Sequence, residues 1–172
     1  ITNFVSQPDM KPKRKFLLID EAWSLLKLKN TAEFITNSFK TYRKYHCSAV
    51  AITQEIVDLM GNACGVAIQA NAANKVFLKQ EPNVIDSLKT FASLTEIEIE
   101  LLKSVETQKG KFSEALVISD SSRGVIRLVP DPLLYWLATS DAKENDYLEN
   151  MIQKFEGRYL EALKECAKEC PH

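Results

Sequence analysis

The pattern of apolar and charged residues changes most sharply at residues 15–23, Lys-Phe-Leu-Leu-Ile-Asp-Glu-Ala-Trp. Four consecutive apolar residues, 16–19, follow a cluster of lysine and arginine and end at two carboxylates, Asp20 and Glu21. A short apolar run with charged residues at both ends predicts a fully buried strand, as in a parallel sheet. Ligands of open α/β sheets bind beyond the carboxyl ends of the strands, so the two acids fall where a ligand would lie.

A second run of small and β-branched residues, 48–53, predicts another buried strand, which ends at the amide of Gln54. Between the two runs, apolar residues at helical spacing in 30–45 predict a helix. The order strand, acid pair, helix, strand and amide is the order that a βαβ nucleotide site needs. The chain is therefore predicted to have an α/β fold.

The remaining residues alternate between helical and strand patterns, and they include a β-hairpin around the turn residues 120–124. Thr95 and Glu98 form a capping-box pattern at the start of one of the helices. The further expected elements are helices at 66–71, 81–91, 95–105, 132–138 and 141–170, and strands at 75–78, 112–118 and 125–129.

The composition is that of an ordinary globular protein, with 172 residues, 45% hydrophobic residues and 26% charged residues. A formal net charge of −1 gives no electrostatic basis for nucleic acid as the main partner. No apolar run reaches the roughly 18 residues of a membrane span, and the amino end has no signal-peptide pattern. Four cysteines in 172 residues do not indicate a disulfide scaffold. Because the chain begins at Ile1, we expect it to be the latter part of a longer protein.

The acid pair suits nucleotide hydrolysis. A carboxylate at a strand tip can hold Mg²⁺ through its waters, which is the role expected of Asp20. A second carboxylate, Glu21, can orient or deprotonate the attacking water. An amide at the next strand tip, Gln54, can bond to a γ-phosphate or to that water. This is the Walker B arrangement; the simpler alternative is an apolar strand that ends in an acidic turn, followed by a strand-ending amide.

Three other groups of residues leave alternatives open. Arg43 either balances the dipole at a helix end or senses a phosphate or a neighbouring subunit. Arg123, at the tip of the hairpin, either reaches a neighbouring nucleotide or is an exposed turn arginine. Cys166, Cys170 and His172 either form part of a metal site or are a histidine and two thiols on a terminal helix, and no fourth ligand follows in the sequence.

Taken together, the segments resemble one family, the conjugative-transfer ATPases of type IV secretion systems of the TraC and VirB-type class. These are RecA-like P-loop NTPases of the FtsK/HerA superfamily. The likeness covers about residues 14–150, and the ordered set of motifs is much more specific than the acid pair alone. The residues that carry it are 16–23 (FLLIDEAW), 43–44 (RK), 51–54 (AITQ), 71–78 (NAANKVFL) and 131–139 (DPLLYWLAT).

The resemblance implies an ATPase that works as a hexamer with ATP and Mg²⁺. It would be peripheral on the cytoplasmic face of a bacterial inner membrane, bound to inner-membrane components of the secretion system. Direct binding of nucleic acid is not expected. By motif match, Asp20 would coordinate Mg²⁺, Glu21 would be the catalytic base and Gln54 the γ-phosphate sensor. Arg43 would lie at or near the subunit boundary, whereas Arg123 matches no motif of the family.

The chain departs from the family pattern because it contains no Gly-x-x-x-x-Gly-Lys-[Ser/Thr] loop, and the first of its five glycines is Gly61. The loop that cradles the phosphates is therefore expected outside this chain. We expect these residues alone to be inactive. The strand that ends at Gln54 would also have an unpaired edge, which favours self-association.

The expected fold is a partial RecA-like P-loop NTPase core, with a mostly parallel sheet flanked by helices and without the Walker A strand. A β-hairpin and a C-terminal helical tail complete it. The expected division is a linker at 1–14, the C-terminal part of the ATPase domain at 15–139 and the helical tail at 140–172.

Two other functions stay open at this point. One is a DNA-pumping coupling protein or translocase of the same superfamily, which would share the acid pair and the sensor. The other is a non-catalytic interaction module, in which the amphipathic tail helix from Asp141 would be the docking surface.

Overall fold

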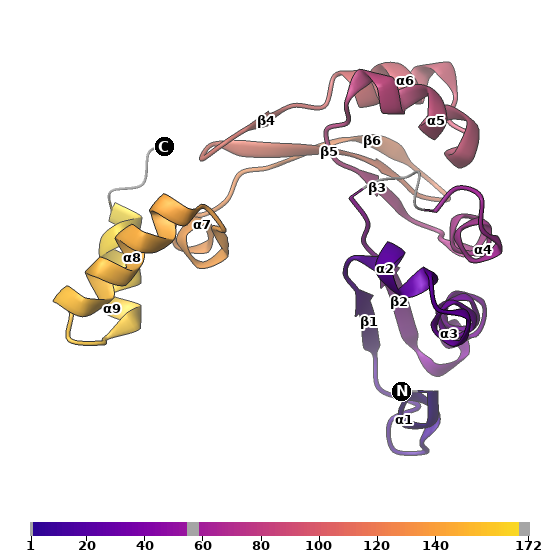
Figure 1. The fold of residues 1–172 in the computed structure, drawn as a ribbon, viewed down its shortest axis with the longest axis horizontal. Helices are drawn as coiled ribbons and strands as arrows, with labels where there is room; N and C mark the ends of the chain where they lie inside the picture. Colours follow the sequence, from indigo (N-terminus) through magenta and orange to yellow (C-terminus); the bar gives the residue numbers. More distant parts are fainter. Residues whose placement is uncertain (1, 55–58, 169–172) are drawn as a thin grey trace.

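The computed structural model describes residues 2–54 and 59–168. In chain order they form an N-terminal α/β part, a central antiparallel sheet with two helices, and a C-terminal group of helices (Figure 1). Figure 1 shows these parts as an arch, with the central sheet at its top and the other two parts on either side.

The N-terminal part is built on a parallel strand pair. β1 and β2 run in register from Lys15↔Cys47 to Ile19↔Ala51, and helix α3 makes the crossover between them. Helix α4 packs against α3. The elements of this part are α1 (Thr2–Ser6), β1 (Lys15–Ile19), α2 (Ala22–Leu26), α3 (Lys29–Thr41), the 3₁₀-helix η1 (Tyr42–Tyr45), β2 (Cys47–Ala51) and α4 (Ala63–Asn71).

Strand β1 buries one of its faces. Ile19 is buried and packs with Ala22 and Ile35, which are both fully buried. Phe16 and Leu18, which alternate with Leu17 and Ile19 along the strand, are 72% and 68% exposed. The prediction of a strand buried on both faces is therefore wrong for the described residues, because α3 and α4 cover only one side of the pair.

Among the described residues β2 pairs with β1 alone. The self-association expected from an unpaired strand edge remains a prediction.

The first fourteen residues, expected as a linker, contain a helix that packs against the N-terminal part. Val5 of α1 is 3% exposed and lies in a small cluster with Tyr42 and Cys47. Its apolar side chain fixes α1 against η1 and the start of β2, since burial of such a side chain is favourable.

The central part is a four-stranded sheet in which β5 is the middle strand. β6 pairs with β5 over residues 113–118, and the other edge of β5 pairs with β3 at residues 116–118 and with β4 at residues 112–113. Leu88, Leu102 and Leu116 form the core between the helices and the sheet. The elements are β3 (Lys75–Phe77), α5 (Pro82–Ala92), α6 (Glu96–Lys103), β4 (Thr107–Gln108), β5 (Phe112–Ile118) and β6 (Arg123–Leu128).

The α/β class, the first parallel pair and the β-hairpin are confirmed. The predicted Thr95–Glu98 capping box is also present at the start of α6. The sheet is less parallel than expected, because the pairs of β3, β4 and β6 with β5 are all antiparallel. The short turns before and after β5 explain much of this, since parallel neighbours need a crossover of about a dozen residues or more.

The C-terminal part consists of α7 (Pro132–Ala138), α8 (Ala142–Lys154) and α9 (Tyr159–Lys168). The prediction of one long helix from 141 to 170 is wrong. Glu156 and Gly157 take left-handed backbone angles, with φ of 54° and 82°, and this turn reverses the chain between α8 and α9. The reversal lets both helices pack on Trp136 of α7.

Cys166 is fully buried in the core of this part, as the thiol alternative predicts. Cys170 and His172 lie outside the described residues. Within residues 2–54 and 59–168, no helix is long and apolar enough to cross a membrane.

Candidate functional site

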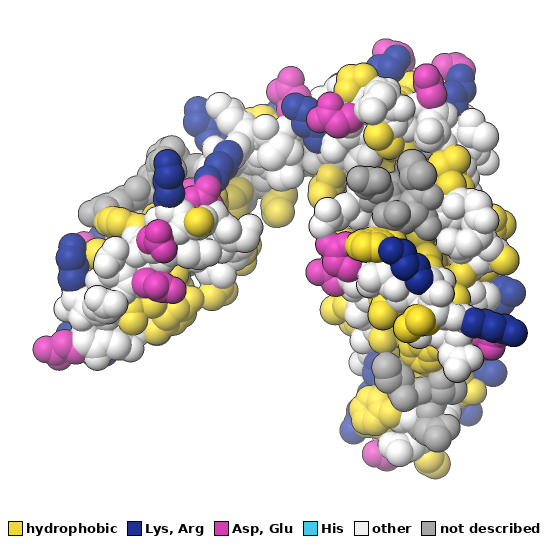
Figure 2. Space-filling model, in the orientation of Figure 1, with side chains coloured by type: hydrophobic (Ala, Val, Ile, Leu, Met, Phe, Trp, Pro, Cys, Tyr) yellow, Lys and Arg dark blue, Asp and Glu magenta, His cyan; other side chains and the backbone are white. Residues whose placement is uncertain are grey.

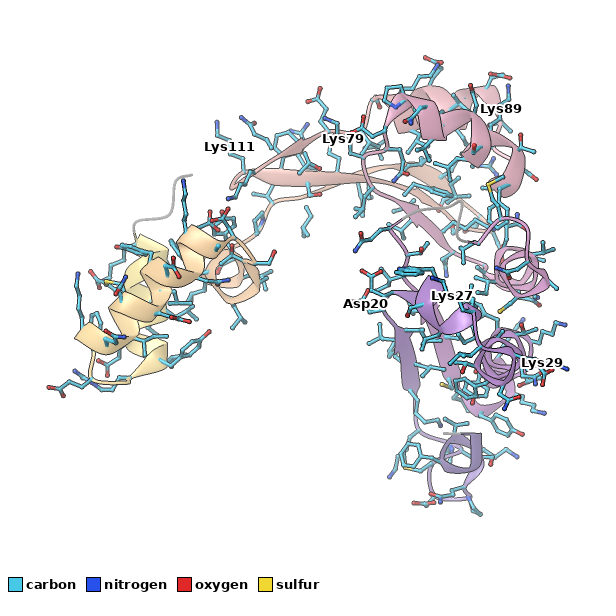
Figure 3. All side chains as sticks on the ribbon, in the orientation of Figure 1. Asp20, Lys27, Lys29, Lys79, Lys89 and Lys111 are labelled. Atoms are coloured by element: carbon cyan, nitrogen blue, oxygen red, sulfur yellow. The ribbon has the colours of Figure 1, made fainter. Side chains whose placement is uncertain are left out.

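The carboxyl ends of β1 and β2 meet, as the sequence order predicts for a βαβ unit. The hydrogen-bond ladder continues past both strands, because the Ile52 N–H donates to the Ile19 carbonyl at 2.8 Å and the Ala22 N–H donates to the Ile52 carbonyl at 2.9 Å. The acids that follow β1 are thereby fixed beside the residues that follow β2. Figure 3 shows Asp20 at the end of β1 and Lys27 at the end of the adjoining helix α2, which it directly follows.

Glu21 turns the chain from β1 into α2. Its backbone is left-handed, with φ of 49° and ψ of 45°, which is uncommon for a residue other than glycine. Such angles occur preferentially at functional sites, where the surrounding structure holds them. Here the turn is held by the Ser24 N–H and hydroxyl, which donate to the Glu21 carbonyl at 3.0 and 2.8 Å.

The Glu21 carboxylate accepts one hydrogen bond on each oxygen. The side-chain amide of Gln54 donates to Oε1, and the indole Nε1 of Trp23 donates to Oε2 at 2.5 Å. The structure thus brings together two of the predicted site residues, which are separated by 33 positions in the chain.

Asp20 is exposed beside this pair. Its Oδ1 accepts a hydrogen bond from the Glu21 backbone N–H at 2.9 Å, which leaves the rest of the carboxylate facing solvent. A single carboxylate with open surroundings suits Mg²⁺, which keeps several waters and takes further oxygens from substrate phosphates. No group of three or more acidic, histidine or cysteine side chains that could hold a metal occurs in the described part of the chain. Asp20 is thus a donor that fits Mg²⁺, but it does not form a complete cage.

Arg43 lies away from the acid pair within one chain. It belongs to η1, which leads into the amino end of β2, and the register pairs that end with Lys15 at the start of β1. Five strand residues separate the two ends of the sheet, a length of about 13 Å at 3.3 Å per residue. Arg43 therefore lies near a helix end, at the end of the strand pair opposite Asp20.

Arg123 forms an ion pair within the chain. Its guanidinium donates to Oε1 of Glu98 at 2.8 Å, and the Glu98 side chain is only 4% exposed. Burial by itself would raise the pKa of Glu98, but hydrogen bonds from Thr95 and the charge and hydrogen bond of Arg123 hold that pKa below its ordinary value. Arg123 thus joins the start of β6 to α6.

Trp23 is the site residue that the sequence did not single out. It stands two positions after Glu21, within the predicted motif, and it lines a shallow hollow with Leu26, Lys27 and Asn62. The ammonium of Lys27 lies 4.3 Å from the centroid of the Trp23 ring. The position of Trp23 close to the acid pair in the sequence could have indicated that it belongs to the site. The direction of its N–H, however, depends on the left-handed turn at Glu21.

The chain is similar to two curated proteins over most of its length. Type IV secretion system protein CagE of Helicobacter pylori is 32% identical over 140 residues, which are 77% of this chain and 14% of CagE. Protein TraC of Escherichia coli is 29% identical over 150 residues, which are 79% of this chain and 16% of TraC. The chain therefore spans about one sixth of these relatives or less.

The fold is also similar to a solved structure, that of VirB4 of Thermoanaerobacter pseudethanolicus. The match has a TM-score of 0.56 at 25% identity and covers 77% of this chain and 33% of the VirB4 chain. The family model of the TraG P-loop domain matches residues 2–170 of this chain. That match runs through nearly all of the sequence, including the strand tips that hold Asp20, Glu21 and Gln54. The chain belongs to the TraG P-loop domain family.

Proposed function

We propose that this chain supplies the Walker B half of an ATP-hydrolysing site in the ATPase of a type IV secretion system. The observation that carries the proposal is the hydrogen bond between Gln54 and Glu21 at the adjoining ends of two parallel strands. The family match supports a P-loop domain, and the name of CagE, a type IV secretion system protein, supports the secretion context.

Each of the three polar residues has a distinct role in the proposed site. The Asp20 carboxylate holds Mg²⁺ through its waters, and that ion would neutralise charge on the phosphates when bound. The Glu21 carboxylate orients the attacking water and takes its proton. Gln54 carries a neutral amide, which can donate either to Glu21 or to a phosphate oxygen, so it can report the presence of the γ-phosphate.

The proposed site is incomplete within these residues. No phosphate-cradling glycine loop occurs in the sequence, so the groups that hold the triphosphate would come from outside these 172 residues. We propose that the whole protein binds ATP with Mg²⁺ as a hexamer. It would act at the cytoplasmic face of the inner membrane, with membrane components of the secretion system as partners.

Arg43 enters this proposal only across a subunit boundary. It is exposed and lies at the end of the sheet opposite the acid pair, so a role at the nucleotide would require the site of a neighbouring copy.

The test is Glu21→Gln in the whole protein. We expect turnover of Mg²⁺-ATP to fall by about 100-fold or more, because general-base catalysis contributes that much, while ATP binding persists. Glu33→Gln is the matched control, since Glu33 is an exposed glutamate on α3. Wild-type turnover by Glu21→Gln would overturn the catalytic assignment.

Incompleteness is tested separately on the 172 residues alone. We expect no Mg²⁺-dependent turnover, and turnover that Glu21→Gln abolishes would contradict the proposal.

The two alternative functions predict different results. DNA-stimulated turnover by the whole protein would favour a DNA-pumping translocase. Secretion that survives Asp20→Asn would favour a non-catalytic module.

A further inference from the structure

The Glu21 carboxylate needs more than one fixed contact to work as a base. Its backbone is held in the left-handed turn, but its side chain extends from that turn by several rotatable bonds. A catalytic group must be held to within about 0.5 Å of its working position. In this structure only two side chains, Gln54 and Trp23, donate to the carboxylate among the described residues.

These two donors differ in what else they can do. The amide of Gln54 is exposed at a strand tip, and the proposed function requires it to turn toward a phosphate. The indole of Trp23 has a single donor and no acceptor, so it has one polar contact to make. When Gln54 leaves Glu21, the contact from Trp23 is the one that remains.

Trp23 is itself held in place from two sides. Its neighbour Ala22 is fully buried in the core of the N-terminal part, which fixes the start of α2. Lys27, one helical turn further, lies over the face of the indole ring at 4.3 Å from its centroid. A cation in that position attracts the ring face and leaves the N–H at the ring edge free to point at Glu21. Packing alone would explain a half-buried tryptophan, but it would not explain an N–H 2.5 Å from Oε2.

We infer that Trp23 is a positioning residue for Glu21, whose indole N–H holds the carboxylate in place while Gln54 exchanges between Glu21 and the nucleotide. The inference rests on the proposed function, because it assigns a role at the same site.

The kinetic test is Trp23→Phe in the whole protein, which keeps an aromatic ring and removes the N–H. We expect kcat to fall by about 10-fold to 100-fold, the usual effect of losing a hydrogen bond to a charged group, with KM for ATP unchanged. Trp136→Phe is the matched control. Its indole Nε1 is buried without a hydrogen-bond partner in the described structure, so the same exchange removes no hydrogen bond there. Turnover by Trp136→Phe should match that of the wild type.

A double-mutant cycle separates positioning from general damage. Since Trp23 acts through the Glu21 carboxylate, adding Trp23→Phe to Glu21→Gln should cause no further loss of kcat. A further loss of the same size as in the single variant would overturn the inference.

The contact itself is tested without any activity. Tryptophan labelled with ¹⁵N in the whole protein gives an indole resonance for Trp23, identified as the one that Trp23→Phe removes. We expect Glu21→Ala to shift this resonance, because it deletes the acceptor, and Glu33→Ala to leave it in place.

These experiments distinguish a failure of the proposed function from a failure of the role of Trp23. If Glu21→Gln hydrolyses ATP normally, the proposed function fails. If Glu21→Gln is inactive but Trp23→Phe turns over at the wild-type rate, or if its resonance ignores Glu21→Ala, only the role of Trp23 fails.

Discussion

At the scale of single residues, one glycine allows helix α4 to lie close to the backbone of Leu59. Gly65 is buried, and a Cβ at this position would lie 1.9 Å from the carbonyl oxygen of Leu59. A backbone carbonyl cannot swing aside as a flexible side chain can. The Asn62 side chain caps the same helix by accepting from the Gly65 N–H at 2.7 Å. The close contact therefore fixes where α4 begins relative to Leu59.

Gly65→Ala should lower the free energy of unfolding by about 1–3 kcal/mol, the usual cost of overpacking, or by more if the helix cannot shift. Thermal unfolding followed by circular dichroism measures the change. Gly124→Ala is the control, because nothing lies within 4 Å of a Cβ at Gly124. Equal melting temperatures for the two variants would show that the contact at Leu59 is unimportant.

At the scale of elements, α6 is joined to the β-hairpin through a nearly buried carboxylate. Glu98 caps its own helix by accepting from the Thr95 N–H at 2.7 Å, and it also accepts from Arg123 on β6. Burial opposes the charge on Glu98, but these hydrogen bonds and the arginine outweigh it and lower the pKa. One side chain therefore serves both the start of the helix and its packing on the sheet.

The lowered pKa gives a pH dependence with a definite sign. A carboxylate whose pKa is lower in the folded state contributes full stability above its ordinary value of 4.5, and the contribution is lost as the pH falls below that value. Glu98→Gln keeps a capping-box residue but does not titrate. We expect it to cost about 1 kcal/mol at neutral pH and to lose less stability on acidification than the wild type.

Urea unfolding at a series of pH values measures this difference. Glu100→Gln is the control on the same helix, because the side chain of Glu100 is 73% exposed. If acidification destabilises Glu98→Gln as much as the wild type, the contribution of Glu98 is refuted.

At the scale of the whole molecule, the C-terminal helices are tied to the central sheet through a turn. Lys109, between β4 and β5, lies 2.5 Å from Oδ2 of Asp141 and 3.2 Å from Oε1 of Glu144. Figure 3 shows the turn that carries Lys111 beside the C-terminal helices. Glu144 also accepts from the Tyr135 hydroxyl at 2.7 Å, which joins α7 to α8.

Exposed apolar residues occur on β6 and on the C-terminal helices. They include Leu134 and Leu137 on α7 and Leu128 on β6, which are 48%, 60% and 60% exposed. Figure 2 shows hydrophobic side chains on the underside of the C-terminal helices. Among the described residues, the apolar cores of the N-terminal part and of the C-terminal helices have no residue in common.

Lys109→Met should speed amide hydrogen exchange at the start of α8 without unfolding the C-terminal helices, whose own apolar core is untouched. Lys109 is 64% exposed, so solvent screens its ion pairs and the global stability should change little. Lys111→Met, in the same turn, is the control, because the described residues give Lys111 no ion pair. Exchange rates at residues 141–145 that do not differ between the two variants would contradict this role.

The features that could be predicted are those that depend on neighbours in the sequence. The hairpin turn before Arg123 and the Thr95–Glu98 capping box rest on contacts within a few residues. The strand that ends before Asp20 was predicted from a local run of apolar residues, although its pairing partner is distant in the chain. The errors arose where distant segments decide. The prediction of a single tail helix was wrong because Glu156 and Gly157 turn the chain, so that α9 can pack on α7 and α8. The prediction of a mostly parallel sheet was wrong because β3, β4 and β6 all pair with β5 in the antiparallel direction.

By itself, the sequence determined that an acid pair and an amide end two neighbouring strands, because the βαβ order forces both ends to one edge of the sheet. Only the tertiary structure decided how the side chains meet there. The parallel register put Arg43 at the opposite end, and the left-handed turn at Glu21 brought its carboxylate between Gln54 and Trp23. Hydrophobic periodicity specifies which faces are buried, but the direction of a hydrogen bond depends on backbone angles and on partners that are distant in the chain.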